Sequence, residues 1–136
     1  MSRSVTKGTK AESAIVAFLK PWWPATERRA KTGNKDRGDI AGVVGQRGKI
    51  VIEAKDCVRV ELAQWLDEAR LEQANDEADV GVVWFKRRGQ SDPGKWFVLM
   101  DGQTFAHLAL NAGYGNPPHD PERFAKEDQW WKEGHQ

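Results

Sequence analysis

Residues 38–55 have the sequence GDIAGVVGQRGKIVIEAK. Two runs rich in β-branched residues, 39–45 and 49–55, stand on either side of Gly45-Gln46-Arg47-Gly48, a combination typical of a β-hairpin. Successive side chains of a strand point to opposite faces, so each run has one face for a core and one for other uses. This stretch predicts two antiparallel strands joined by a tight turn, and the rest of the chain can be arranged around them.

The open end of this hairpin carries polar residues. Strand alternation puts Glu53 and Lys55 on one face, about 7 Å apart. Asp39 is about as far from the turn on the partner strand, so strand pairing brings it beside them. The alternative is structural: Asp39 caps a turn, and Glu53 and Lys55 form the exposed face of an edge strand.

Two converging carboxylates repel each other unless a cation lies between them. Oxygen ligands suit Mg²⁺ or Mn²⁺, and Mg²⁺ keeps several waters, so few protein ligands are needed. A lysine beside such an ion can orient or deprotonate a water molecule and stabilise charge on a phosphate. If the metal is present, the hairpin therefore favours hydrolysis of a phosphodiester bond.

Outside the hairpin, the spacing of apolar residues predicts further elements. They are helices over 9–20, 60–78 and 103–112, and strands over 26–30, 80–85 and 95–100. This order predicts one α/β domain, 1–136, with a mixed β-sheet between helices. Residues 1–6 are expected to be a flexible start, and 114–136 a C-terminal extension.

The net charge of +1 hides an uneven distribution, because residues 1–59 carry 13 basic residues against 6 acidic ones. Such a basic first half suggests a polyanionic partner, although a solvated basic surface explains it about as well. No apolar run is long enough to span a membrane, and no signal peptide is expected. Cys57 is the single cysteine, so we expect a cytoplasmic protein without an internal disulfide.

Several segments of the sequence match one known pattern. They are residues 7–12 (KGTKAE), 29–35 (RAKTGNK), 38–40 (GDI) and 51–55 (VIEAK). On these residues the chain resembles the PD-(D/E)XK nuclease superfamily, and most closely the small Holliday junction resolvases of archaea and bacteriophages. Gly38 stands where the family has Pro. The resemblance implies a restriction-endonuclease-like fold with the element order αβββαββα.

The resemblance also implies roles for the polar residues of the hairpin. Asp39 and Glu53 would hold Mg²⁺, for which Mn²⁺ substitutes, with the Ala54 carbonyl as a further ligand. Lys55 would position the attacking water. Glu12 would complete the site, although Thr9-x-x-Glu12 also matches a capping box at a helix start.

Basic and small polar residues near this hairpin are candidates for contact with the DNA backbone, which needs charge but no base recognition. They are Lys7, Lys10, Arg28, Arg29, Lys31, Thr32, Asn34, Lys35 and Arg37. A solvated loop is the alternative for the segment 28–37.

The sequence therefore predicts a Mg²⁺-dependent DNA endonuclease, and the resemblance suggests a homodimer that resolves four-way junctions. Two alternatives remain: a restriction-type, repair or end-processing nuclease, and a catalytically inert DNA-binding module. Cys57 is expected to be a buried structural thiol. The pairs Trp22-Trp23 and Trp130-Trp131 are expected to pack at an interface or to stack on exposed bases.

Overall fold

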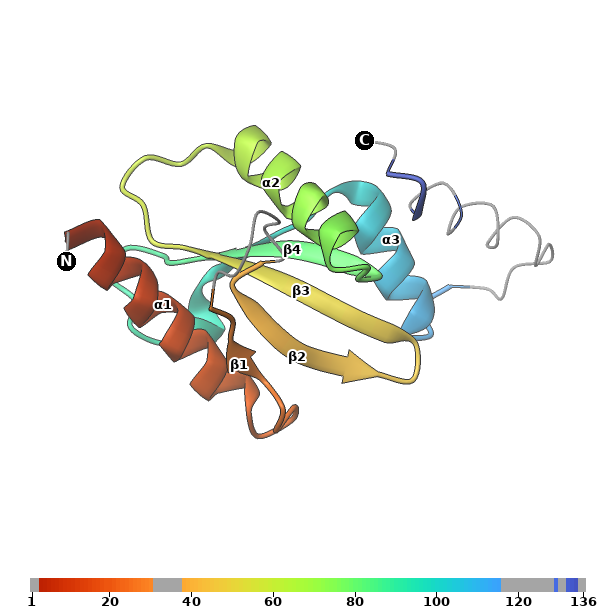
Figure 1. Cartoon of the computed structure of the whole chain (residues 1–136), viewed down its shortest axis with the longest axis horizontal. Coiled ribbons are helices and arrows are strands. Elements are labelled where there is room, and N and C mark those ends of the chain that lie inside the picture. Colours follow the sequence, from red (N-terminus) through yellow and green to blue (C-terminus); the bar gives the residue numbers. More distant parts are fainter. Residues whose placement is uncertain (1–2, 31–37, 116–128, 130–131, 135–136) are drawn as a thin grey trace.

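The computed structural model describes residues 3–30, 38–115, 129 and 132–134. A mixed β-sheet lies at the centre of this part of the chain, and helices pack against it (Figure 1). The sheet contains β1 (Glu27–Arg28), β2 (Ile40–Gly45), β3 (Gly48–Lys55), β4 (Val80–Phe85) and β5 (Phe97–Leu99), side by side in that order. The expected α/β class is confirmed.

The central strand β3 and its neighbour β4 are parallel, and every other neighbouring pair is antiparallel. A parallel pair needs a crossover connection, and α2 (Leu62–Asn75) provides it. After β4, the short 3-10 helix η1 (Pro93–Lys95) leads into β5, and α3 (Gly102–Asn111) follows. The predicted hairpin is confirmed, with Gly45 opposite Gly48 at its turn.

Helices cover both faces of the sheet. On one face, α1 (Arg3–Leu19) packs Ile15 into a core with Ile52 of β3. On the other face, α2 packs Trp65 and Ala69 against Val83 of β4. Because side chains alternate along β3, Glu53 points to the face that α2 covers. The candidate site therefore lies on the face of β3 that α2 covers.

Helix α1 starts earlier than the sequence predicted. The sequence predicted a flexible start over residues 1–6, whereas α1 already begins at Arg3. No proline interrupts this segment, and the single Gly8 weakens a helix by only about 1 kcal/mol. Thr9 consequently lies inside the helix, so the alternative interpretation of Thr9 and Glu12 as a capping box is wrong.

Two further boundaries differ from the predictions. Of the segment 95–100, expected to be one strand, only Phe97–Leu99 forms β5. Lys95 instead ends η1, whose start is capped by Asp92, which accepts a hydrogen bond from the N–H of Gly94. Most of 114–136 lies outside the described residues. Among the helices that the structure describes, none combines the length and the apolar character needed to cross a bilayer.

Candidate active site

Asp39 is held against β3 by its backbone and its side chain. Its N–H donates to the Ile52 carbonyl at 3.1 Å, and its Oδ2 accepts a hydrogen bond from the N–H of Ala54 at 3.0 Å. These two hydrogen bonds connect Asp39 to the residues that precede and follow Glu53 in β3. Asp39 and Glu53 are each 8% exposed, so both side chains are buried at the open end of the hairpin.

A β-bulge in β2 turns Asp39 toward Glu53. The register runs from Gly45 opposite Gly48 to Val43 opposite Ile50, then shifts so that Ile40 lies opposite Ile52. An unshifted ladder would pair Ile40 with Glu53 and send both to the same face. The bulge instead buries Ile40 with Ile52 on the α1 face. The preceding residue, Asp39, is thereby directed to the face of Glu53.

Gly38 is required by the same geometry. Its φ is +93°, and a Cβ placed there would lie 2.3 Å from Cγ2 of Val51. Proline holds φ near −65°, so the family's Pro does not fit this backbone. The departure from the family pattern at Gly38 is therefore explained by the local conformation.

Glu53 has one carboxylate oxygen beside a cation and one without a partner. Its Oε1 lies 3.7 Å from Nζ of Lys55. Its Oε2 is buried and accepts no hydrogen bond from any residue that the structure describes. Burying an unpaired carboxylate oxygen is unfavourable, so this atom is suited to binding a cation or a donor.

Lys55 bridges β3 and α2. Its Nζ lies 2.8 Å from Oε2 of Glu68, closer than to Glu53. Partial burial alone lowers the pKa of Lys55, but the hydrogen bond to Glu68 and the negative charges of Glu53 and Glu68 together raise the pKa above its ordinary value of 10.5. Lys55 is therefore an ammonium group at neutral pH.

Sequence reasoning missed Glu68. It lies on α2 in a run of acidic residues, which the sequence alone assigns equally well to a solvated helix face. The order of the elements could have indicated its role. Helix α2 follows β3 directly and must cross back over it before β4 can pair in parallel with β3. A helix in that position faces the Glu53 and Lys55 side chains.

Glu12 has a different partner from the one expected. Its Oε2 lies 2.9 Å from Nε of Arg28, across the contact between α1 and β1. Within residues 3–30 and 38–115, no three or more His, Cys, Asp or Glu side chains are placed to share a metal ion. The structure therefore brings Asp39, Glu53 and Lys55 together and does not add Glu12 to them.

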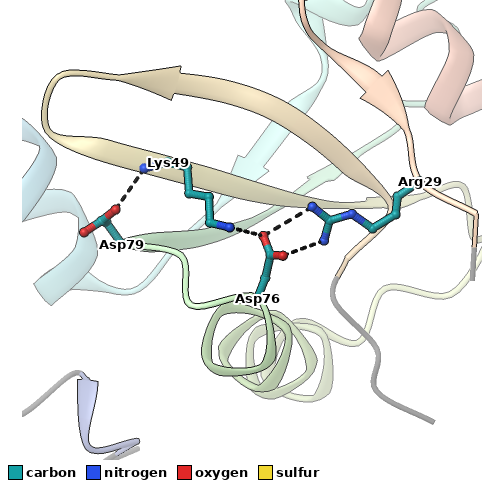
Figure 2. Close-up of polar contacts among 4 residues, drawn as sticks. All are labelled: Arg29, Lys49, Asp76 and Asp79. Carbon is teal, nitrogen blue, oxygen red and sulfur yellow. Dashed lines mark hydrogen bonds and ion pairs between the residues drawn. The ribbon is translucent and has the colours of Figure 1, made fainter. Parts of the chain in front are cut away.

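Arg29, expected to contact DNA, forms an ion pair with a buried acid (Figure 2). Its guanidinium lies 2.9 Å from Oδ1 of Asp76, which is 2% exposed at the end of α2. Lys49 Nζ approaches Oδ2 of the same carboxylate at 3.5 Å, and the Lys49 N–H donates to Asp79 at 2.8 Å. The Arg29 N–H also donates to the Asp39 carbonyl at 2.7 Å. This network fixes the backbone beside Asp39.

The other residues expected to bind DNA are placed only in part. Arg28 is paired with Glu12, and Lys10 is exposed on α1. Lys31, Thr32, Asn34, Lys35 and Arg37 lie outside the described residues, as does the side chain of Lys7.

Three predictions outside the hairpin can also be compared with the structure. Cys57 is exposed, so the expected buried thiol is wrong; the chain has left β3 two residues earlier. Trp22 is 62% exposed and contacts Phe18 edge to face, while Trp23 packs against the α1-side core. The pair Trp130-Trp131 lies outside the described residues.

Searches of protein families, curated proteins and solved structures find no match to this chain.

Proposed function

We propose that this protein is a divalent-metal-dependent DNA endonuclease of the PD-(D/E)XK type. The observation that supports it most is the buried Oε2 of Glu53, which has no partner among the described residues. The other oxygen of this carboxylate, Oε1, lies 3.7 Å from the Lys55 ammonium, and the N–H of Ala54, the next residue in β3, holds the Asp39 carboxylate in place. Two acids and a lysine in this relation are the residues that the family resemblance requires.

The donor set fits a hard divalent cation. Asp39 and Glu53 would hold Mg²⁺ or Mn²⁺, with the Ala54 carbonyl as the further ligand that the resemblance implies. Two carboxylates and one carbonyl suffice for Mg²⁺, since this ion keeps several of its waters. When bound, the ion would supply Lewis-acid activation of water and of the phosphate.

The chain's own residues have separable tasks in this proposal. Lys55 contributes a fixed positive charge that stabilises the negative charge developing on the phosphate oxygens. Because its pKa is raised, Lys55 acts as a charge and hydrogen-bond donor rather than as the base that removes a proton from water. Glu68 orients the Lys55 ammonium, and the Ala54 N–H orients the Asp39 carboxylate.

The substrate we propose is a four-way DNA junction, cut by a homodimer with a restriction-endonuclease-like fold. The motif resemblance supports the junction as the substrate. The need to cut two strands of the junction supports the homodimer. Paired cuts on opposing strands need two sites related by a two-fold axis.

The deciding experiment compares cleavage of a labelled four-way junction with that of a linear duplex made from the same arms, with Mg²⁺ and with EDTA. Symmetric, Mg²⁺-dependent cuts in the junction alone are expected. Cutting of both substrates would keep the nuclease and remove the preference for junctions. No cleavage of either substrate with Mg²⁺ or Mn²⁺ would contradict the proposed activity.

Substitutions assign the site. Asp39→Asn and Glu53→Gln keep the side-chain shape but remove charge, so each is expected to lower cleavage by several orders of magnitude while DNA binding remains. Asp67→Asn, on the exposed face of α2, is the matched control and should cleave as the wild type does. Equal cleavage by all three variants would exclude Asp39 and Glu53 from the mechanism.

A further inference from the structure

Three consecutive cations, Lys86, Arg87 and Arg88, follow the end of β4 and are exposed. We call them the basic turn. Several other basic residues form ion pairs, but within the described part of the chain none is found for these three. Their charge is therefore available to a partner.

The basic turn leaves the sheet next to the candidate active site. Phe85, the last residue of β4, lies opposite Lys55 in the parallel register. The N–H of Lys86 donates to the Lys55 carbonyl at 3.0 Å, which fixes the start of the turn to the end of β3. Both strands run toward the same end of the sheet, and the turn extends beyond it (Figure 1).

Arg87 lies on the same face as Lys55. Phe85 packs against Trp65 of α2 with ring centroids 5.2 Å apart, and against Phe97 at 5.1 Å. The Arg87 guanidinium is in turn 5.8 Å from the centroid of Phe97. This series of contacts places Arg87 on the α2-covered face, to which Lys55 also points.

Aromatic rings hold two of these cations without using up their hydrogen-bond donors. Arg87 lies over Phe97, and Nζ of Lys86 lies 6.0 Å from the centroid of Trp96. Such cation–π contacts restrict the side chain while its N–H groups stay directed to solvent. Arginine donors arranged in this way suit the oxygens of a phosphate.

The cations expected from the sequence contrast with the basic turn. Arg28 and Arg29 are paired with Glu12 and Asp76 and are less able to neutralise phosphates. We infer that the basic turn is a binding site for the phosphodiester backbone of DNA and places the strand across Lys55. The inference rests on the proposed nuclease function for its ligand, and it assigns a contact that does not depend on base sequence.

Binding measured without cleavage tests this directly. The full chain would be titrated into a labelled four-way junction in EDTA, at several KCl concentrations, with anisotropy as the readout. Each phosphate contact contributes about −0.9 to the slope of log K against log salt. Arg87→Gln is expected to reduce the magnitude of that slope by about 1. The triple variant Lys86→Gln, Arg87→Gln and Arg88→Gln should reduce it by about 2 to 3 and weaken binding at least tenfold.

Arg47→Gln is the matched control, because Arg47 is an exposed arginine at the β2–β3 turn, the opposite end of β3 from Lys55. It should leave the slope unchanged. In cleavage assays, Arg87→Gln should raise KM and change kcat little, since the contact binds substrate and transition state alike. Circular dichroism would verify that each variant is folded.

The outcomes separate this inference from the proposed function. Basic-turn variants that bind DNA as Arg47→Gln does would overturn the inference, even if the wild type cleaves DNA. Wild-type binding that depends on the basic turn, with no cleavage in Mg²⁺ or Mn²⁺, would support the inference and contradict the nuclease. A wild type that neither binds nor cleaves DNA would contradict both.

Discussion

At the scale of single residues, the backbone conformation of Gly38 determines the position of Asp39 in the candidate site. Gly38→Ala would place a methyl group against Val51 in a left-handed conformation. We expect it to lower the free energy of unfolding by about 1–3 kcal/mol and to abolish most cleavage, because Asp39 must move with its neighbour. Urea denaturation and the junction assay measure both effects. Gly45→Ala is the control, since a Cβ at Gly45 meets nothing within 4 Å.

The Lys55 ion pairs predict a pH dependence of stability. A lysine whose pKa is raised by folding contributes stability that is fully present below its unfolded pKa and is lost as pH rises through its folded pKa. The difference in unfolding free energy between the wild type and Lys55→Met should therefore stay constant from pH 7 to about 10 and change in favour of Lys55→Met above that. A difference that stays flat to pH 11 would contradict the raised pKa. Lys20→Met, an exposed site, is the control.

The relative positions of the polar side chains in the hairpin were partly predictable, because side chains alternate strictly between the two faces of a strand. Glu53 and Lys55 share a face for this reason alone. The length of the turn placed Asp39 at the same end of the hairpin, but the face on which it lies depends on the bulge in β2. The partners Glu68 and Arg28 were not predictable in the same way. Each depends on how a helix packs on the sheet, and a helix position in sequence does not fix its neighbour across a packed face.

At the scale of elements, the Arg29–Asp76–Lys49 network joins the segment that follows β1, strand β3 and the end of α2 (Figure 2). Asp76→Asn would leave two cations facing a neutral, buried amide. We expect it to destabilise the fold by about 3 kcal/mol, because breaking a buried ion pair leaves charge uncompensated. Thermal and urea unfolding measure this, with the exposed Asp67→Asn on the same helix as the control. A loss equal to that of the control would show that Asp76 does not contribute.

The types of most elements followed from apolar spacing, whereas the bulge in β2 and the early start of α1 did not. The bulge depends on Gly42, which has a φ of +99° and lies so close to Ala25 that a Cβ would meet its carbonyl oxygen. A glycine in a strand permits such a bend without specifying it. The start of α1 lies in a polar segment, where no apolar periodicity marks the helix.

At the scale of the whole molecule, the proposed metal should stabilise the fold. A ligand that binds only the folded state adds about 2.7 kcal/mol at a concentration one hundred times its Kd. Mn²⁺ should therefore raise the Tm of the wild type, by a smaller amount in Glu53→Gln and not at all in Asp39→Asn paired with Glu53→Gln. This measurement needs no DNA. An equal rise in the wild type and the double variant would indicate metal binding elsewhere.

The charge distribution was a partial guide at this scale. Composition pointed to a polyanionic partner from the basic residues 1–59, yet two of those arginines, Arg28 and Arg29, pair with acids in the fold. The basic turn lies outside that region, in a segment of balanced charge. The basic turn lies next to Lys55 because β3 pairs in parallel with β4, and no local sequence pattern predicts that pairing.

The placement of both carboxylates on one hairpin has a consequence for the order of folding. Asp39 and Glu53 belong to a local unit, and hairpins of this kind close in about 1–10 µs. Lys55 meets Glu68, and the basic turn reaches Lys55, only after α2 has formed and β4 has docked across the long crossover. Non-local pairing of this kind is slow, so the acidic half of the site should assemble first and its cationic half last. Pulse-labelled hydrogen exchange would then protect the Ala54 amide, which binds Asp39, before the Lys86 amide, which binds Lys55.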